Sequence, residues 1–237
     1  MKWIKTEKDL LSPILSIAPF IVREDCSYAV TTELPAGYRI IDIMIATLPE
    51  TWDRKNLSHF VSKLRPLTLQ SLVVLERIFT FGRISKRKLA RELHIDQTIL
   101  EEKYLSFFEN LGLISRVTAF SYEITEWVKW SPSEVISIEA KLYRWKEALE
   151  QAMFNMRFAD RTYVAFPEEI FQRYKNEMKV AKHVGVGVII VRKNGDAEVE
   201  IEAKNNHQKK FIDRGLQKLR ILRDLILLDN RWKINEF

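Results

Sequence analysis

Cysteine, glycine and proline are scarce in this chain of 237 residues, and each shortage excludes a class of protein. The single cysteine, Cys26, excludes an intrachain disulfide framework and any zinc site built from several cysteines. Seven glycines and seven prolines exclude collagen-like and low-complexity sequences. The low cysteine content also favours a reducing compartment, so we expect a cytoplasmic protein.

Long apolar runs and several common catalytic motifs are missing as well. The longest apolar run covers residues 184–191, which is too short to cross a bilayer, so we expect no membrane partner. The sequence contains no glycine-rich phosphate loop, HExxH or GxSxG motif, which excludes the common NTPases, metalloproteases and serine hydrolases that carry these motifs. The four histidines are scattered without the spacing of metal ligands.

Basic residues outnumber acidic ones by 38 to 32, which gives a formal net charge of +6. Much of this excess lies in residues 204–237, with nine basic and four acidic side chains. Such an excess is compatible with nucleic acid or another anionic surface, and also with an ordinary solvated helix face. The candidate nucleic-acid contacts in this region are Lys209, Lys210, Arg214 and Lys218.

The two ends of the sequence predict a mixed α/β sheet. Residues 28–34 and 38–47 resemble two strands joined by the turn Pro35-Ala36-Gly37. After residue 134, predicted strands alternate with helices, as in a sheet flanked by helices. These strands cover residues 135–141, 162–166, 184–192 and 197–202, and Asn194-Gly195 predicts a hairpin between the last two. Helices are expected over residues 7–17, 143–157, 168–179 and 207–228, with Pro13 bending or interrupting the first.

The middle of the chain has a different pattern. Three helices, separated by Gly82 and by the caps Ser85 and Asp96, are followed by two short alternating strands. The phrase ISKRKLARELHIDQTILEEKYLSFFENLGLI resembles a winged helix-turn-helix segment. We therefore expect a winged helix over residues 66–127, inserted into a discontinuous α/β domain of residues 1–65 and 128–237.

The charges of this insert favour two roles over sequence-specific recognition of DNA. Residues 66–127 carry eight basic and eight acidic side chains, and the third helix is acidic, whereas a helix that reads DNA is usually basic. The candidate nucleic-acid contacts lie around the second helix: Lys86, Arg87, Lys88 and Arg91. We expect non-specific positioning of DNA or contact with a protein, either a second copy of the chain or another partner.

Acidic side chains interrupt two strands that are otherwise apolar. Asp42 lies within RIIDIMIA, and Glu139 and Lys141 lie two residues apart at the end of VISIEAK. A carboxylate in a central strand is costly unless it is paired or binds a metal. On neighbouring strands, Asp42, Glu139 and the Ala140 carbonyl would form an oxygen-rich site suited to Mg²⁺, with Mn²⁺ as a substitute. A buried ion pair in an inactive scaffold is the alternative.

The acid-x-lysine spacing alone does not select Glu139. It also occurs at Asp53, Glu101, Glu177 and Glu202, and residues 201–204 repeat the tetrapeptide Ile-Glu-Ala-Lys of residues 138–141. Context distinguishes Glu139, because an acid-bearing strand precedes it and a helix follows it.

The order Asp42…Glu139-Ala140-Lys141 resembles the PD-(D/E)XK nuclease superfamily, and the segment IEAKLYRWKEALEQAMFNMRFADRTYVAF is similar to its prokaryotic members. The resemblance implies a restriction-endonuclease-like fold that cleaves nucleic acid, most simply DNA, with Mg²⁺. It makes Asp42 and Glu139 metal ligands and Lys141 the group that orients water. Gln151 matches the helix glutamine of the RecB-like branch, whose tyrosine four residues later is replaced here by Asn155.

Some assignments stay open. Glu33 either joins the metal site from the partner strand or is an exposed strand residue, and Gln151 is either catalytic or a helix-surface amide. The leading hypothesis is a metal-dependent nuclease. The alternatives are a non-catalytic DNA-binding regulator whose nuclease-like core is degenerate, and a small-molecule sensor attached to a winged helix.

Overall fold

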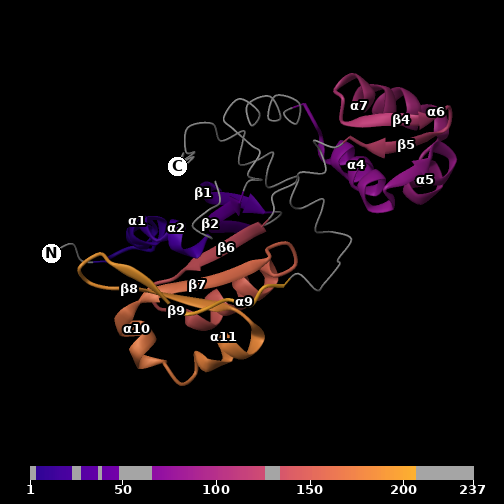
Figure 1. The fold of residues 1–237 in the computed structure, drawn as a ribbon. Helices are drawn as coiled ribbons and strands as arrows, with labels where there is room; N and C mark the ends of the chain where they lie inside the picture. Colours follow the sequence, from indigo (N-terminus) through magenta and orange to yellow (C-terminus); the bar gives the residue numbers. More distant parts are fainter. Residues whose placement is uncertain (1–3, 23–27, 37–38, 48–65, 126–133, 207–237) are drawn as a thin grey trace. The chain divides into compact units, whose positions relative to one another are not determined.

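The structure is a computed structural model that describes residues 4–22, 28–36, 39–47, 66–125 and 134–206. The chain divides into two compact units (Figure 1). Among the described residues, those before residue 48 and those from 134 to 206 belong to the first unit, and residues 66–125 belong to the second.

The first unit is built on a mixed six-stranded sheet with the order β1-β2-β6-β7-β8-β9. Its strands are β1 (Tyr28–Ala36), β2 (Arg39–Thr47), β6 (Glu134–Ala140), β7 (Arg161–Pro167), β8 (Gly187–Val191) and β9 (Ala197–Ile201). The β6–β7 and β7–β8 pairs are parallel, and the other neighbouring pairs are antiparallel. The predicted α/β class, with a mixed sheet flanked by helices, is confirmed.

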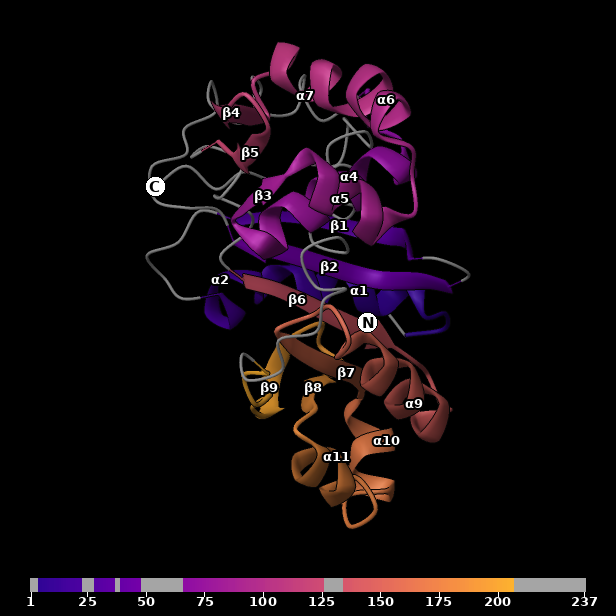
Figure 2. The same ribbon diagram turned by 90° about the vertical axis from the view of Figure 1, so that its right-hand side faces the viewer.

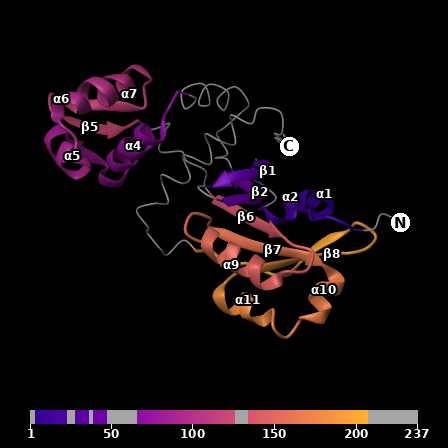
Figure 3. The ribbon, with the colours of Figure 1, turned by 180° about the vertical axis from the view of Figure 1, so that it is seen from behind.

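Helices cover both faces of this sheet (Figures 1 and 3). They are α1 (Lys8–Ser16), α2 (Ala18–Ile21), α9 (Trp145–Asn155), α10 (Glu168–Arg173) and α11 (Lys179–Val184). Leu10 and Ile14 of α1 pack with Ile43 and Ile138 of the sheet. On the opposite face of the sheet, α9, α10 and α11 pack against alternate residues of β7 and β8, of which Val164 is the first. Period-two alternation therefore gives β7 and β8 two apolar faces, whereas the second face of β6 carries Ser137 and Glu139.

Several predicted boundaries were wrong. Pro35 and Ala36 belong to β1 rather than to the turn. The helix around Pro13 is not interrupted, because buried Leu10 and Ile14 hold it against the sheet on both sides of the proline. The predicted helix over residues 168–179 ends at Arg173 as α10, and a separate helix, α11, begins only at Lys179. The strand expected from residue 184 begins only at Gly187, because α11 continues to Val184.

The second unit contains three helical segments and a small antiparallel sheet. The helical segments are α4 (Leu69–Phe81), α5 (Lys86–Leu93) and a continuous run of α6 (Gln97–Leu100), η1 (Glu101–Leu105) and α7 (Ser106–Asn110). The strands are β3 (Arg83–Ser85), β4 (Ile114–Thr118) and β5 (Ser121–Ile124), in the order β3-β5-β4. The three helices and the hairpin lie where the sequence predicted them, whereas β3 was not predicted.

The helices of the second unit begin and end at the expected residues. The Ser85 side chain accepts a hydrogen bond from the Lys88 amide, and the Asp96 carboxylate accepts from the amides of Thr98 and Ile99. These amide donors hold the pKa of Asp96 below its usual value. Gly82 ends α4 with a positive φ of 68°, a conformation that favours glycine.

Candidate functional site

Asp42 and Glu139 lie on adjacent strands, as the sequence predicted. β2 lies beside β6 (Figure 2) and pairs with it through Ile43–Ile138 and the following residues, and continuing this register by one pair sets Asp42 opposite Glu139. Directly opposed residues of antiparallel strands project from the same face of a sheet. The topology therefore brings together two acids that are far apart in the sequence.

Asp42 ends the ladder between these strands with its own side chain. Its Oδ2 accepts a hydrogen bond of 2.8 Å from the backbone N–H of Ala140, the residue after Glu139. The ammonium of Lys141 lies 3.9 Å from the same oxygen. Asp42 thus contacts two successive residues of the Glu139-Ala140-Lys141 segment.

The environment of Asp42 raises the pKa of its carboxyl above the usual 3.8. Burial is the largest cause, while the Ala140 amide and the Lys141 charge act in the opposite direction. The carboxylates of Glu7 and Glu33 add a further upward contribution. Asp42 is therefore a partly desolvated acid close to other negative charge, an environment that a cation would stabilise.

Lys141 lies between two carboxylates. Its Nζ is 3.9 Å from Asp42 and 3.6 Å from Glu7, which precedes α1. The Lys141 side chain is only 11% exposed, and its backbone amide donates to the Ala165 carbonyl of β7. The lysine is consequently fixed beside Asp42 by both its main chain and its charge.

Glu139 is 3% exposed and turns toward α9. Its Oε1 accepts a hydrogen bond of 2.6 Å from the amide of Asn155, which is 1% exposed. Gln151 lies one helical turn before Asn155, so the two amides share one face of α9. The Gln151 Oε1 atom is buried and has no hydrogen-bond partner among the described residues.

Glu33 lies on β1, the other neighbour of β2, at the position that the strand register sets opposite Asp42. The pairs of β1 with β2 pass from Thr32–Ile43 to Leu34–Ile41, and Glu33 between them has a left-handed φ of 55°. Its carboxylate pairs with the Lys8 ammonium at 3.0 Å, and both side chains are exposed. This contact agrees with the interpretation of Glu33 as a surface residue.

The potential metal donors of this region are all oxygen atoms. Asp42, Glu139 and the Ala140 carbonyl offer oxygen atoms, which Mg²⁺ prefers, and Mg²⁺ in proteins is often bound by only one or two carboxylates. Across the described ranges, no three histidine, cysteine, aspartate or glutamate side chains are grouped so that they could hold a metal ion. A metal here would therefore complete its coordination with water or substrate oxygens.

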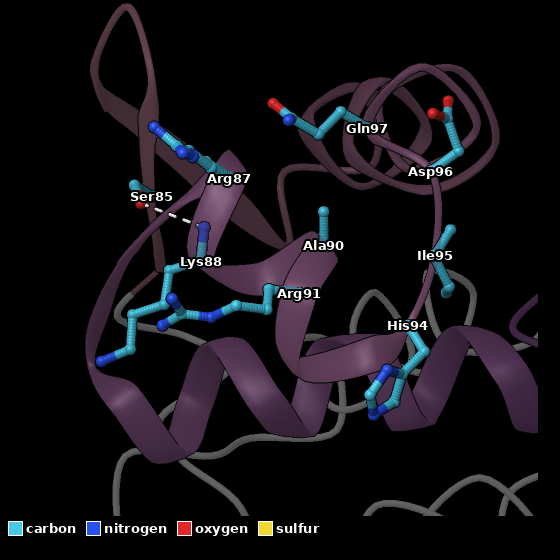
Figure 4. Close-up of a pocket in the computed structure, with 9 residues that line it drawn as sticks. All are labelled: Ser85, Arg87, Lys88, Ala90, Arg91, His94, Ile95, Asp96 and Gln97. Carbon is cyan, nitrogen blue, oxygen red and sulfur yellow. Dashed lines mark hydrogen bonds between the residues drawn. The ribbon is translucent and has the colours of Figure 1, made fainter.

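The predicted basic contacts of the second unit border a groove of about 550 Å³ (Figure 4). Its lining includes Arg87, Lys88 and Arg91 of α5, together with His94 and the start of the next helix at Gln97. The three basic side chains belong to exposed residues. Lys88 also lies over the Phe81 ring, 4.3 Å from its centroid. This surface of α5 therefore carries three exposed positive charges.

Lys86 differs from the other three basic residues of α5, because it is half-buried and paired within the unit. Its ammonium lies 3.2 Å from Glu101, which also pairs with Arg116 at 2.9 Å. Arg116 pairs with Glu109 at 2.8 Å as well, and the Tyr122 hydroxyl donates to Glu101. Two of the three glutamates that make the third helix acidic are thus neutralised inside the unit.

The remaining predicted contacts, Lys209, Lys210, Arg214 and Lys218, lie outside the described residues, as does the predicted helix that carries them. The same is true of the segments that connect the two units. None of the helices in the described part of the chain is long and apolar enough to cross a membrane.

Comparisons with protein families, curated proteins and solved structures give no match for this chain. The case for a function therefore depends on the geometry of the two sites.

Two residues of the first site were not predicted as site residues. Asn155 was noted only as a departure from the RecB-like pattern, although its position four residues after Gln151 places it on the same helix face. Glu7 could not be predicted, because no local spacing links it to Lys141. Only the packing of the N-terminal segment against the sheet brings these two charges together.

Proposed function

We propose that this protein is a metal-dependent nuclease that hydrolyses phosphodiester bonds at Asp42, Glu139 and Lys141. The observation that carries this proposal is the contact of Asp42 with both Ala140 and Lys141, on the strand next to the one that holds buried Glu139. An acid pair followed by a fixed lysine is the chemistry that the resemblance to PD-(D/E)XK nucleases implies. A restriction-endonuclease-like arrangement of the sheet belongs to the same proposal.

In this proposal Asp42, Glu139 and the Ala140 carbonyl hold Mg²⁺ or Mn²⁺. Such an ion, when bound, lowers the pKa of water and neutralises charge on a phosphodiester. Lys141 orients the attacking water and stabilises negative charge as the new phosphorus–oxygen bond forms and the ester bond to the leaving oxygen breaks. Gln151 has a buried oxygen free to accept a hydrogen bond from water or substrate.

The second unit, in this proposal, is a winged helix that positions nucleic acid through α5. Arg87, Lys88 and Arg91 present three exposed positive charges beside a groove, and phosphate contacts of this kind supply affinity without sequence preference. DNA is the simplest partner. The third helix remains a weak candidate for reading bases, since Glu102 is exposed and acidic on it.

A second function, a non-catalytic DNA-binding regulator, has one observation in its favour. Lys141 pairs with both Asp42 and Glu7, which is an arrangement that a structural ion pair would also adopt. In that case the α5 surface would bind DNA, and the first unit would act as a scaffold.

A cleavage assay with matched variants tests the proposed function. Glu139→Gln keeps an acceptor for the Asn155 amide but removes the charge that a metal requires. Glu202→Gln is the control, because Glu202 occupies the same place in the repeated Ile-Glu-Ala-Lys tetrapeptide and directly follows the edge strand β9. We expect Mg²⁺- or Mn²⁺-dependent cleavage of DNA by the wild type, a loss of about 100-fold or more in Glu139→Gln, and little change in Glu202→Gln. Absence of cleavage with single- and double-stranded DNA and RNA would favour the regulator.

A further inference from the structure

The last residue of α9, Asn155, makes a short buried hydrogen bond to Glu139. Its Nδ2 donates to Glu139 Oε1 over 2.6 Å, and both residues are almost completely buried. The helix that carries Asn155 packs against the strands of the sheet. The amide therefore reaches Glu139 from an element that is itself fixed.

A buried asparagine at a helix end is unusual without a purpose, because its amide has two donors and an acceptor to satisfy. The backbone of Asn155 already accepts from the Phe158 and Ala159 amides and so closes the helix without the side chain. The side chain is consequently available for Glu139. A carboxylate that accepts a hydrogen bond from a fixed N–H group can no longer rotate freely, and one of its oxygens is occupied by that hydrogen bond.

We infer that Asn155 is a positioning residue, which holds the Glu139 carboxylate in the orientation needed to bind the divalent metal ion. This inference rests on the proposed function of the site. Asn155 does not itself contact the ion or the substrate. It acts as outer-shell partners of metal ligands generally do, by orienting a ligand and thereby raising the affinity of the site.

The test uses the full chain and Mn²⁺ as the probe. In Asn155→Leu, the leucine side chain has nearly the same shape as asparagine but no N–H group to donate. If this variant does not fold, Asn155→Ser takes its place, because the serine hydroxyl is too short to reach Glu139. The control is Thr162→Val, which removes the buried hydrogen bond between Ser137 and Thr162 on the same sheet and leaves Glu139 untouched. Mn²⁺ affinity is measured from the electron paramagnetic resonance signal of the free ion, at a temperature where melting curves show each variant folded.

We expect the Asn155 variant to bind Mn²⁺ about 10–100-fold more weakly than the wild type, and Thr162→Val to bind it as the wild type does. The value of kcat should fall at subsaturating Mn²⁺ and recover as the ion is added, with KM for DNA unchanged. Wild-type Mn²⁺ affinity in a folded Asn155 variant would overturn this inference and leave the proposed function intact. A wild type that neither binds Mn²⁺ nor cleaves nucleic acid would overturn both.

Discussion

The backbone N–H of Ala140 donates to Asp42 Oδ2 over 2.8 Å, so a side chain of β2 ends the ladder at the place where β6 carries Glu139 and leads into Lys141. This contact fixes Asp42 close to two residues of the predicted motif. It also places the carboxyl where burial and the charges of Glu7 and Glu33 raise its pKa.

Asp42→Asn should keep the bond to Ala140, because the asparagine oxygen can still accept it, while the charge disappears. The pKa of Asp42 in the folded protein lies above the unfolded value near 3.8. As the pH rises from the unfolded to the folded pKa, the unfolded state loses its proton first, so the free energy of unfolding decreases. We expect the variant to melt at the same or a higher temperature than the wild type at pH 7, and at a similar one near pH 3. Thermal melts at several pH values check this. A marked loss of stability at pH 7 would mean that the ionised carboxylate is a structural partner.

Lys141→Met should slow cleavage strongly with little loss of stability. Methionine keeps the apolar part of the side chain in place, and the lost charge forms two long ion pairs, at 3.6 and 3.9 Å, so the stability cost should be about 1 kcal/mol or less. The rate of cleavage should fall by about 10²–10³-fold, as on loss of a group that stabilises developing charge.

Lys204→Met is the matched control for that variant. Lys204 ends the repeated tetrapeptide but is exposed, and its substitution should change neither the rate nor the melting temperature. If Lys141→Met instead lost several kcal/mol, a structural ion pair would explain the site better.

Sequence patterns predicted the centre of the first unit well, and the reasons are physical. An acid inside an apolar strand needs a partner, so the presence of Asp42 and Glu139 in two such strands predicted that the strands are neighbours. Contacts made across the fold gave no such signal: Glu7 reaches Lys141 only after α1 packs on the sheet. The early end of α10 at Arg173 was missed because buried Phe171 and Met178 lie seven residues apart, a spacing that also fits a continuous helix.

Charge reversal on α5 tests the second unit. Replacing Arg87, Lys88 and Arg91 with glutamate should weaken binding to all duplex DNA sequences alike. For each phosphate that the protein no longer neutralises, the slope of log affinity against log salt should decrease by about 0.9. Fluorescence anisotropy at several salt concentrations measures this slope.

Lys86→Gln serves as the control for charge reversal. Lys86 is half-buried against Glu101, so its replacement should leave the salt slope unchanged. Equal affinity of the triple variant and the wild type would return the α5 surface to an ordinary solvated face.

Two buried tyrosines predict how stability changes at high pH. Burial and a glutamate acceptor raise the pKa of Tyr163 to about 12, and burial and the hydrogen bond to Glu101 raise the pKa of Tyr122 to about 12. Since both values exceed the usual 10, the stability from the neutral phenols is complete below pH 10 and is lost as the pH rises toward 12. Chemical denaturation between pH 8 and 12 should show this decline, and Tyr163→Phe should reduce it. A curve that is the same in Tyr163→Phe and the wild type would contradict the prediction.

The most direct test of the nuclease site is a crystal structure of the wild type soaked in Mn²⁺, with anomalous data collected at the manganese edge. We expect one strong peak between the carboxylates of Asp42 and Glu139, at about 2.1 Å from an oxygen of each, as for a small hard cation. The same peak should be missing from crystals of Glu139→Gln. Wild-type crystals with no anomalous density between these two residues, at Mn²⁺ concentrations that support cleavage, would contradict the account.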